Sequence, residues 1–324
     1  MRRSLSANKR KRKLIKSIFA ILAIIVVTVL VAQRANGSKN NDLVNLSYNG
    51  EIAIELNNNV PPFNTADLKK AQKGYESYSK LDTLGRCGVA EASVCLDTMP
   101  DDGEKRTSLG SINPSGWQSI NFWCRCHLIG WQLTAENANE KNLITGTTRM
   151  NMSGMLPYEN CIANYLEEHP DDHVLYRVEP LFDGDNLIAS GVCLQAESVE
   201  DKGKGVCFNV YVFNYQPGFI INYNNGMVFD DPEHQTVITL SDKKAKYTGE
   251  PIKIDEANID GSSGSTNYIY YTDINAKIKT TEKEGALDRG SAPTNRGTYY
   301  VRAVVSGDNW FPTAVSNIAK LEIN

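Results

Sequence analysis

The sequence predicts an α+β domain with a mixed or antiparallel sheet, followed by an all-β domain. All seven cysteines lie between residues 87 and 207, where short strand-like segments are mixed with a helical one. Beyond residue 236 there is no cysteine, and short strands recur between turns rich in Gly, Asn and Asp, which is typical of a small β-sandwich. The acidic segment 230–233 is the expected linker between the two domains.

The chain has 324 residues, enough for one large domain or two ordinary ones. Its formal net charge of −4 conceals an asymmetry. Residues 1–37 carry nine Lys and Arg and no acidic side chain, and the rest carries 25 basic and 38 acidic side chains. Proteins that bind nucleic acids are usually basic, so such a role would need a local basic patch or a bound cation here.

The N-terminus is basic and then apolar. Five basic residues at 9–13 precede an apolar run from Ile18 to Ala32, an order that keeps the N-terminus in the cytoplasm and directs the rest outward. A membrane-spanning helix needs ~20 residues, a length that the run approaches when counted from Leu14. A cleaved signal peptide is the alternative, because Ala-Asn-Gly at 35–37 offers a small-x-small site.

We therefore expect a cytoplasmic basic tail at residues 1–13, a transmembrane signal-anchor or signal peptide at 14–36, and a linker at 37–50. Both interpretations of the apolar run place the remainder of the protein on the extracellular side of the cell membrane, either anchored by a single pass or secreted. The membrane is thus a predicted partner of the N-terminal segment.

In the first domain, strand patterns begin near Glu51 and recur at 173–178 and 208–213, where aromatic and β-branched residues nearly alternate. One helix is indicated by apolar residues at i, i+4, i+7 and i+8; they are Tyr158, Ile162, Tyr165 and Leu166. Pro157 suits its first turn, where a missing N–H costs nothing. In the second domain the expected strands are 236–240, 268–272, 298–305 and 318–323.

Seven cysteines suit an oxidising compartment, where disulfides persist. A hairpin with its tip at 201–203 would let Cys193 and Cys207 face each other, and Cys87 with Cys95 is a second plausible pair. An odd count leaves at least one thiol free, and the connectivity stays open.

Residues 124–159 hold the groups most suited to chemistry. His127 ends one strand, a second strand follows at 142–147, and Asn151 and Glu159 open a helix. An imidazole can take a proton from water near neutral pH. The alternatives for His127 are a structural histidine or a zinc site with Cys124 and Cys126, although Cys-x-Cys-His is poor zinc spacing.

The amide oxygen of Asn151 suits Mg²⁺, which keeps several waters and needs few protein ligands. The alternative role of Asn151 is a helix N-cap. Glu159 lies two helical turns further on and could orient metal-bound waters, or it could be a solvated carboxylate. Three guanidinium groups are candidates for phosphate contacts or are simply solvated charges: Arg106, Arg125 and Arg149.

This ordered set resembles the DNA/RNA non-specific endonucleases with a ββα-metal (His-Me) finger, of the type found in surface or secreted nucleases of Gram-positive bacteria. The family motif Asp/Asn-Arg-Gly/Cys-His is matched by Cys-Arg-Cys-His at 124–127. The resemblance extends over roughly residues 75 to 226. Its further motifs are 114–117, 139–147, 150–151, 154–159 and 173–178. We assign residues 51–228 to this endonuclease domain.

The resemblance implies that His127 is the general base and that Asn151 is the protein ligand of one Mg²⁺, with Mn²⁺ as the alternative ion. It also implies that Glu159 positions metal-bound waters and that Arg125 is the motif arginine, while Arg149 and Arg106 are expected to contact substrate. The substrate that the resemblance implies is DNA, with RNA as a second one, cut without sequence preference. Cys124 departs from the motif, which has Asp or Asn there.

Residues 236–324 resemble the bacterial Ig-like repeats of cell-surface proteins, on the segments 247–249, 267–271 and 297–301. This resemblance implies a cell-surface contact through the second domain. The alternatives to an active nuclease are a catalytically degenerate nucleic-acid-binding protein, a structural surface protein and a zinc enzyme.

Overall fold

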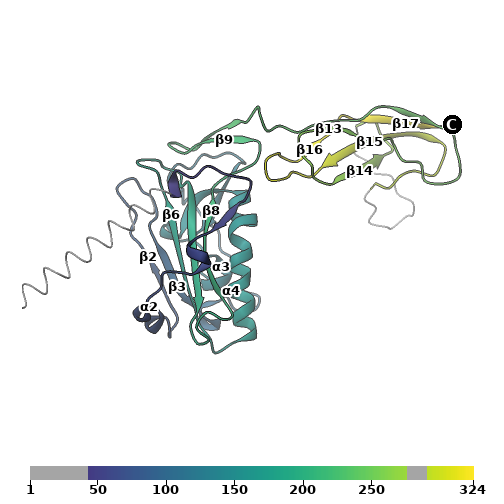
Figure 1. Cartoon of the computed structure of the whole chain (residues 1–324). Coiled ribbons are helices and arrows are strands. Elements are labelled where there is room, and N and C mark those ends of the chain that lie inside the picture. Colours follow the sequence, from purple (N-terminus) through teal and green to yellow (C-terminus); the bar gives the residue numbers. More distant parts are fainter. Residues whose placement is uncertain (1–42, 276–289) are drawn as a thin grey trace, which may run out of the picture.

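The computed structural model describes residues 43–275 and 290–324, which form an α+β domain and a β unit that extends from one end of it (Figure 1). The predicted basic tail at 1–13 and the anchor or signal segment at 14–36 lie outside the described residues. Within the described ranges, no helix is both long and apolar enough to cross a membrane.

The first domain contains ten strands and seven helical segments among the described residues: β1 (Ala53–Glu55), η1 (Asn57–Asn59), α2 (Thr65–Lys70), β2 (Tyr75–Tyr78), β3 (Ala90–Val94), η2 (Leu96–Thr98), β4 (Trp123–His127), α3 (Trp131–Thr134), η3 (Glu140–Asn142), β5 (Leu143–Thr147), η4 (Met150–Met155), α4 (Leu156–Glu168), β6 (Val174–Leu181), β7 (Gly191–Ser198), β8 (Cys207–Phe213), β9 (Phe219–Asn222) and β10 (Met227–Asp230). The described part of the second unit consists of β11 (Val237–Thr239), β12 (Lys243–Ala245), β13 (Asn258–Asp260), β14 (Thr266–Tyr271), β15 (Gly297–Val305), β16 (Ala314–Val315) and β17 (Ala319–Ile323).

A six-stranded antiparallel sheet in the order β1-β8-β7-β6-β3-β2 forms the centre of the first domain. Its central strands are nearly continuous in apolar residues because both faces of the sheet are covered. One face carries the main core against α4, and the other is covered in part by the segment from Leu43 to Leu56. The predicted strands at 173–178 and 208–213 are confirmed as β6 and β8.

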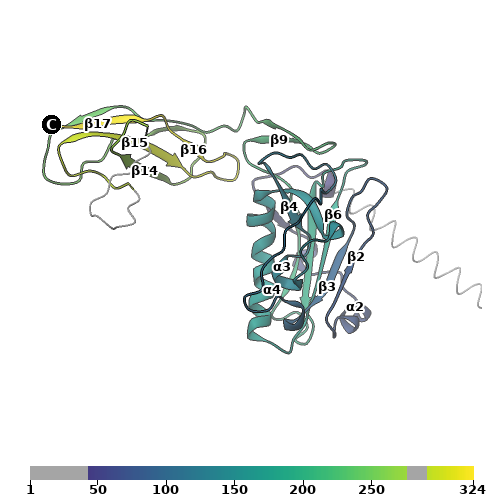
Figure 2. The same ribbon diagram turned by 180° about the vertical axis from the view of Figure 1, so that it is seen from behind.

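Strands β4 and β5 form a separate antiparallel pair, with His127 opposite Leu143. Figure 2 shows β4 with α3 and α4 on one side of the six-stranded sheet. Apolar side chains from this pair and the following loop, among them Cys126, Leu128 and Ile144, enter the main core. The predicted order of strand, strand and helix is therefore confirmed.

The helix after β5 runs from Thr148 to Glu168, and its segment Met150–Met155 is a π-helix. The N–H of Leu156 bonds to the carbonyl of Asn151, five residues back, and the next residue, Pro157, has no N–H to donate. A regular α-helix resumes from there. The predicted inner face is confirmed, because Ile162, Tyr165 and Leu166 are buried.

The predicted disulfides are wrong, since all seven cysteines are free thiols. In the hairpin of β7 and β8, Cys193 lies opposite Tyr211, while Cys207 lies opposite Glu197. The two cysteines are thus four register positions apart, or roughly 13 Å along the strands, because the connecting loop shifts the pairing. Cys87 instead donates hydrogen bonds to the carbonyls of Glu140 and Leu143, at 3.3 and 3.2 Å.

The second unit has a sheet in the order β12-β17-β15-β14, with β16 beside β15, and a separate pair of β11 and β13. It has a core of its own that includes Tyr270, Val301 and Leu321. The four strands predicted here are confirmed as β11, β14, β15 and β17, with bounds that differ by one or two residues. The assignment of this unit to the Ig-like class stays a prediction.

Candidate active site

His127 is held in one orientation by the loop that follows α3. Its Nε2 lies 2.8 Å from the carbonyl oxygen of Asn137. Because a carbonyl can only accept, Nε2 carries the hydrogen, and the lone pair of the neutral ring is on Nδ1. Asn137 is itself buried and fixed, since its amide donates to the carbonyl and hydroxyl of Thr107. The ring therefore presents a defined acceptor nitrogen.

The pKa of His127 is lowered from its ordinary value, first by burial, which disfavours the charged ring, and then by the positive charge of Arg106. The hydrogen bond to the carbonyl of Asn137 acts in the opposite direction. His127 is consequently neutral at physiological pH, which is the state that a general base requires.

Glu159 extends from α4 to the backbone of Gly130, whose N–H donates to the carboxylate. A Cβ atom at position 130 would lie 2.5 Å from Oε2, so a side chain there would displace the carboxylate. Glu159 is only 8% exposed, and burial raises its pKa to about 7, although the Gly130 hydrogen bond and the charge of Arg106 counteract this. The carboxyl is thus buried and is not a solvated surface charge.

Arg106 connects His127 with Glu159 electrostatically, because its charge lowers the pKa of both groups. It lies in the exposed loop before β4, and its guanidinium is 5.1 Å from the ring centroid of Trp131. The structure therefore brings three of the predicted site residues into one cluster: His127, Glu159 and Arg106.

Arg125 lies beside this cluster on β4. Its guanidinium stacks on Trp117, 4.7 Å from the ring centroid, and donates to Asn113 Oδ1 at 3.2 Å. The turn that carries both partners is fixed to β5, because the hydroxyl of Thr145 donates to the carbonyl of Ser115. The orientation of Arg125 is thus set by the turn at 110–117.

Asn151 is the second residue of the π-helical segment and is half-buried. Its Nδ2 lies 3.6 Å from Met152 Sδ, and no donor of the described residues bonds to its Oδ1. The N-cap alternative does not apply, since Thr147 Oγ1 accepts from the N–H of Met150 and caps this helix. Single π-helical turns are frequent at functional sites.

Two polar residues that sequence reasoning missed hold the junction between β5 and this helix. Asn214 Oδ1 accepts from the N–H of Thr147 at 2.9 Å, and Gln216 Oε1 accepts from the N–H of Arg149 at 3.2 Å. Both lie just after β8, more than sixty residues downstream. A lone Asn and Gln after a strand carried no motif that could have identified them.

Cys124, at the first position of the motif, contacts the start of the same helix. Its Sγ lies 3.2 Å from Thr148 Oγ1. Hydrogen bonding from the Cys126 thiol, followed by that from Thr148, lowers the pKa of Cys124 to about 6, against the effect of burial. The thiol at the position where the family motif has Asp or Asn is therefore largely ionised at neutral pH.

Arg149, predicted to contact substrate, faces the second unit. Its Nη2 donates to Asn309 Oδ1 at 2.6 Å, and Nη1 lies 3.5 Å from the carbonyl of Asp308. Of the predicted substrate contacts, only Arg106 thus lies within the His127 cluster.

Within residues 43–275 and 290–324, no three His, Cys, Asp or Glu side chains gather so as to hold a metal ion.

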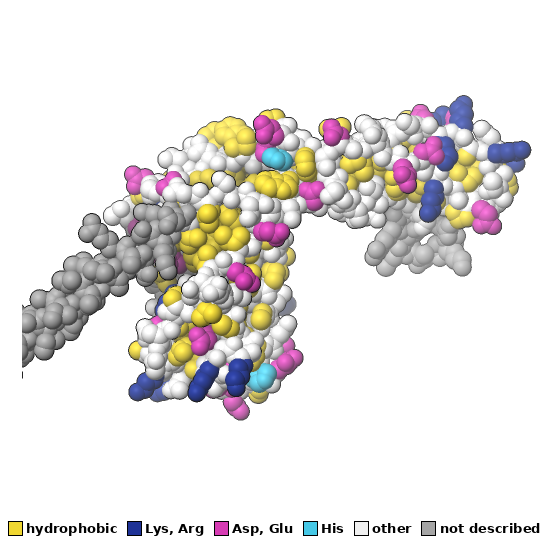
Figure 3. Space-filling model, viewed as in Figure 1, with side chains coloured by type: hydrophobic (Ala, Val, Ile, Leu, Met, Phe, Trp, Pro, Cys, Tyr) yellow, Lys and Arg dark blue, Asp and Glu magenta, His cyan; other side chains and the backbone are white. Residues whose placement is uncertain are grey.

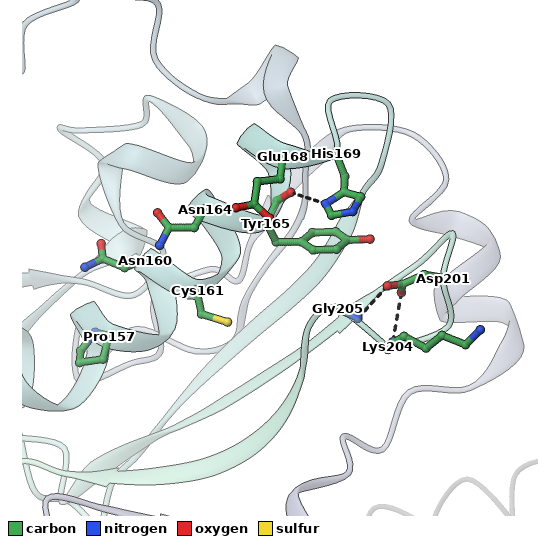
Figure 4. Close-up of a pocket in the computed structure, with 10 residues that line it drawn as sticks. All are labelled: Pro157, Asn160, Cys161, Asn164, Tyr165, Glu168, His169, Asp201, Lys204 and Gly205. Carbon is green, nitrogen blue, oxygen red and sulfur yellow. Dashed lines mark hydrogen bonds between the residues drawn. The ribbon is translucent and has the colours of Figure 1, made fainter.

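A hollow of about 670 Å³ lies away from the His127 cluster, on the outer side of α4 against the turn at 201–205 (Figure 4). It contains Cys161, His169 and Asp201 but none of the six predicted site residues.

Residues 66–200 match the family model described as DNA/RNA non-specific endonuclease. Over 148 residues the chain is 29% identical to a deoxyribonuclease of Streptococcus dysgalactiae subsp. equisimilis. That alignment covers 44% of this chain and 39% of the deoxyribonuclease, so the chain spans about two fifths of the length of this relative. The segment 66–200 is therefore similar to the DNA/RNA non-specific endonuclease domains that the sequence motifs predict.

Among solved structures, NucA from Streptococcus agalactiae with magnesium ion bound has the same fold, with a TM-score of 0.50 and 24% identity. The match covers 60% of this chain and 95% of NucA. The Sda1 nuclease with bound zinc ion gives a TM-score of 0.44 at 26% identity, over 48% of this chain and 81% of Sda1.

Proposed function

We propose that this protein is an extracellular endonuclease that needs a divalent metal ion and hydrolyses the phosphodiester bonds of DNA without sequence preference, with RNA as a second substrate. The observation that carries the proposal is the neutral, oriented imidazole of His127, which shares its surroundings with Glu159 and Arg106. This cluster lies inside the segment that matches a nuclease family.

In the proposed reaction, His127 Nδ1 takes a proton from a water molecule, and the water oxygen forms a bond to phosphorus. The bond from phosphorus to the 3′ oxygen breaks, and that oxygen takes a proton from solvent. One product ends in a 5′ phosphate and the other in a 3′ hydroxyl. The carbonyl of Asn137 stabilises the imidazolium that forms, because it keeps its hydrogen bond to Nε2.

The residues present fit a hard divalent cation such as Mg²⁺, with Mn²⁺ as the alternative. Asn151 offers an amide oxygen that no described donor occupies, and Glu159 offers a buried carboxyl that could hold metal-bound water. When bound, the ion neutralises charge on the phosphoryl oxygens and on the departing oxygen. NucA, which has this fold, was solved with magnesium ion bound.

Positive charge for the phosphates comes from the loops around β4. Arg125 and Arg106 each lie against a tryptophan ring, which limits their motion.

Further positive charge lies on the surface of the molecule. On the face shown in Figure 3, Lys and Arg gather at the lower end of the first domain and at the outer end of the second. Contacts to phosphate carry no sequence information, which fits non-specific cutting.

For the rest of the chain, we propose the endonuclease domain at residues 51–228 and the Ig-like domain, with a cell-surface contact, at 236–324. Leu43, Val44 and Tyr48 fall in the proposed linker at 37–50, yet they pack against the first domain. Export of the protein by the segment at 14–36 completes the proposal.

Digestion of a supercoiled plasmid with and without a chelator tests the proposed function. We expect relaxed, linear and then fragmented DNA in the presence of Mg²⁺, no cutting with excess chelator, and recovery when Mg²⁺ is added back. Binding of the plasmid without cutting under all of these conditions would instead identify a catalytically degenerate nucleic-acid-binding protein.

A further inference from the structure

The loop at 306–312 of the second unit contacts the first domain where the site helix begins. Asn309 Oδ1 accepts from Arg149 Nη2 at 2.6 Å, and the carbonyl oxygen of the same residue accepts from the hydroxyl of Tyr48 at 2.9 Å. One residue of the second unit thus bonds to two separate segments of the first.

This loop has a fixed shape. The carboxylate of Asp308 accepts from the N–H groups of Trp310 and Phe311 and from both the N–H and the hydroxyl of Ser263. These hydrogen bonds outweigh burial and hold the pKa of Asp308 well below its usual range. Because these hydrogen bonds connect Asp308 to later residues of the same loop, the intervening Asn309 is held in a defined position.

Aromatic rings hold the loop against the first domain. The ring of Trp310 lies 5.1 Å from that of Tyr48 and 5.3 Å from that of His234. On its other side, Tyr48 stacks on Tyr215 with 3.8 Å between the centroids. The stack therefore ends at Tyr215. The next residue, Gln216, accepts a hydrogen bond from the backbone N–H of Arg149.

Arg149 makes two of its side-chain hydrogen bonds through this contact. Its Nε is buried and has no partner among the described residues, while its guanidinium donates to Asn309 Oδ1 and to the carbonyl of Asp308 and also bonds to the hydroxyl of Tyr48. A buried polar group without a partner is costly, so loss of the Asn309 side chain, which removes the acceptor of Nη2, weakens the hold on Arg149. Arg149 belongs to the first turn of the helix, two residues before Asn151.

We propose that Asn309 is a positioning residue of the nuclease site: it holds Arg149 and thereby fixes the π-helical turn that presents Asn151. The second unit is then part of the nuclease and not only a surface attachment. This inference rests on the proposed function, and specifically on Asn151 as the cation ligand. The opposite role, in which Asn309 withholds Arg149 from substrate, predicts that loss of Asn309 speeds cutting.

The test uses the full chain with Asn309→Ala, with Asn309→Asp as the conservative variant that keeps an acceptor for Arg149. Asn295→Ala is the matched control, because Asn295 is exposed and lies just before the start of β15, whose first residue pairs with Ile323. Calorimetric titration with Mg²⁺ in the absence of nucleic acid measures binding, and plasmid cutting against Mg²⁺ concentration measures function. Melting temperature reports folding.

We expect Asn309→Ala to weaken Mg²⁺ binding on the order of three- to tenfold, as loss of one hydrogen bond implies, and to raise the half-saturating Mg²⁺ equally. The rate at saturating Mg²⁺ should stay within about twofold of the wild type, and Asn309→Asp and Asn295→Ala should resemble the wild type. If Asn309→Ala does not fold, Tyr48→Phe, which removes one bond to the same loop, should shift binding in the same direction.

Unchanged Mg²⁺ binding in a folded Asn309→Ala protein, or faster cutting by it, would overturn this inference while leaving the proposed function in place. A wild-type protein that cuts no DNA would overturn the proposed function first, and the inference with it.

Discussion

At position 127 the imidazole has one nitrogen bonded to a carbonyl and the other free to take a proton. We expect His127→Ala to lower the plasmid-cutting rate by ~10²–10⁴, because removal of a general base typically has this effect. The melting temperature should change little, since the ring is only partly buried. Added imidazole should restore part of the rate. Cutting at the wild-type rate by the purified variant would refute the assignment.

The pH profile of cutting should reflect the same ring. Since the pKa of His127 is lowered, the active neutral form persists below the ordinary histidine value of about 6.5. We expect the rate at saturating Mg²⁺ to be level down to that pH and to fall tenfold per pH unit only at lower values. A fall centred above pH 6.5 would show that another group, such as Glu159 with its pKa of about 7, limits the reaction.

Glu159 makes stability depend on pH. Its folded pKa of about 7 lies above the ordinary value of 4.5, so between these values the folded state holds a proton that the unfolded state has released. The free energy of unfolding therefore decreases as pH rises through this window. Glu159→Gln, which stays neutral, should gain stability relative to the wild type as pH rises, from less than about 0.5 kcal/mol at pH 4.5 to roughly 3 kcal/mol at pH 7.5. Denaturation with urea in the presence of chelator measures the difference, and a pH-independent difference would contradict this account.

Cys124 should react as a thiolate near neutral pH. Its pKa of about 6 contrasts with the raised pKa values of the exposed thiols Cys161 and Cys207. We expect alkylation of Cys124 by iodoacetamide to reach half its limiting rate near pH 6, whereas the other two thiols should require pH above about 8.5. Mass spectrometry of labelled peptides over pH 5–9 measures this, and Cys124→Ser is the control. A Cys124 rate that increases only above pH 8 would contradict the thiolate.

The junction between β5 and the site helix depends on Asn214. This buried side chain accepts from the N–H of Thr147 and donates to the carbonyls of Thr145 and Ala189. Asn214→Ala leaves three backbone groups without partners, so we expect a loss of roughly 2–4 kcal/mol in the free energy of unfolding. Asn160→Ala, at an exposed position of α4, should cost less than about 0.5 kcal/mol. Similar losses in both variants would show that the hydrogen bonds of Asn214 do not stabilise this junction.

The elements near the site could be predicted because their signals are local. The strand–strand–helix order, the inner face of α4 and the positions of His127 and Glu159 all follow from spacing within a few dozen residues. The burial of Glu159 could not, because it depends on how closely Gly130 approaches from another loop. The partner of Arg149 lies 160 residues away, and sequence periodicity carries no information on such a contact. The disulfide prediction was wrong because a shift of four register positions depends on the loop between two strands.

At the scale of the whole molecule, the two units have separate cores yet share one contact. The main core of the first domain includes no residue beyond Val212, and the core of the second begins at Ile238. We therefore expect a protein that ends at Asp230 to fold and to cut, since His127, Glu159 and Asn151 all remain. Without the loop at 306–312, however, Tyr48 loses its hydrogen bond to the Asn309 carbonyl, and Arg149 loses its hydrogen bond to the Asn309 side chain.

The shortened protein should consequently need more Mg²⁺ for half-maximal cutting, by a factor similar to that of Asn309→Ala, and its first domain should melt at a lower temperature. Comparison of both Mg²⁺ titrations in one assay measures this. If the shortened protein is soluble but inert at every Mg²⁺ concentration, the second unit does more than position one helix. If it behaves as the full chain does, the contact through Asn309 has no part in the reaction.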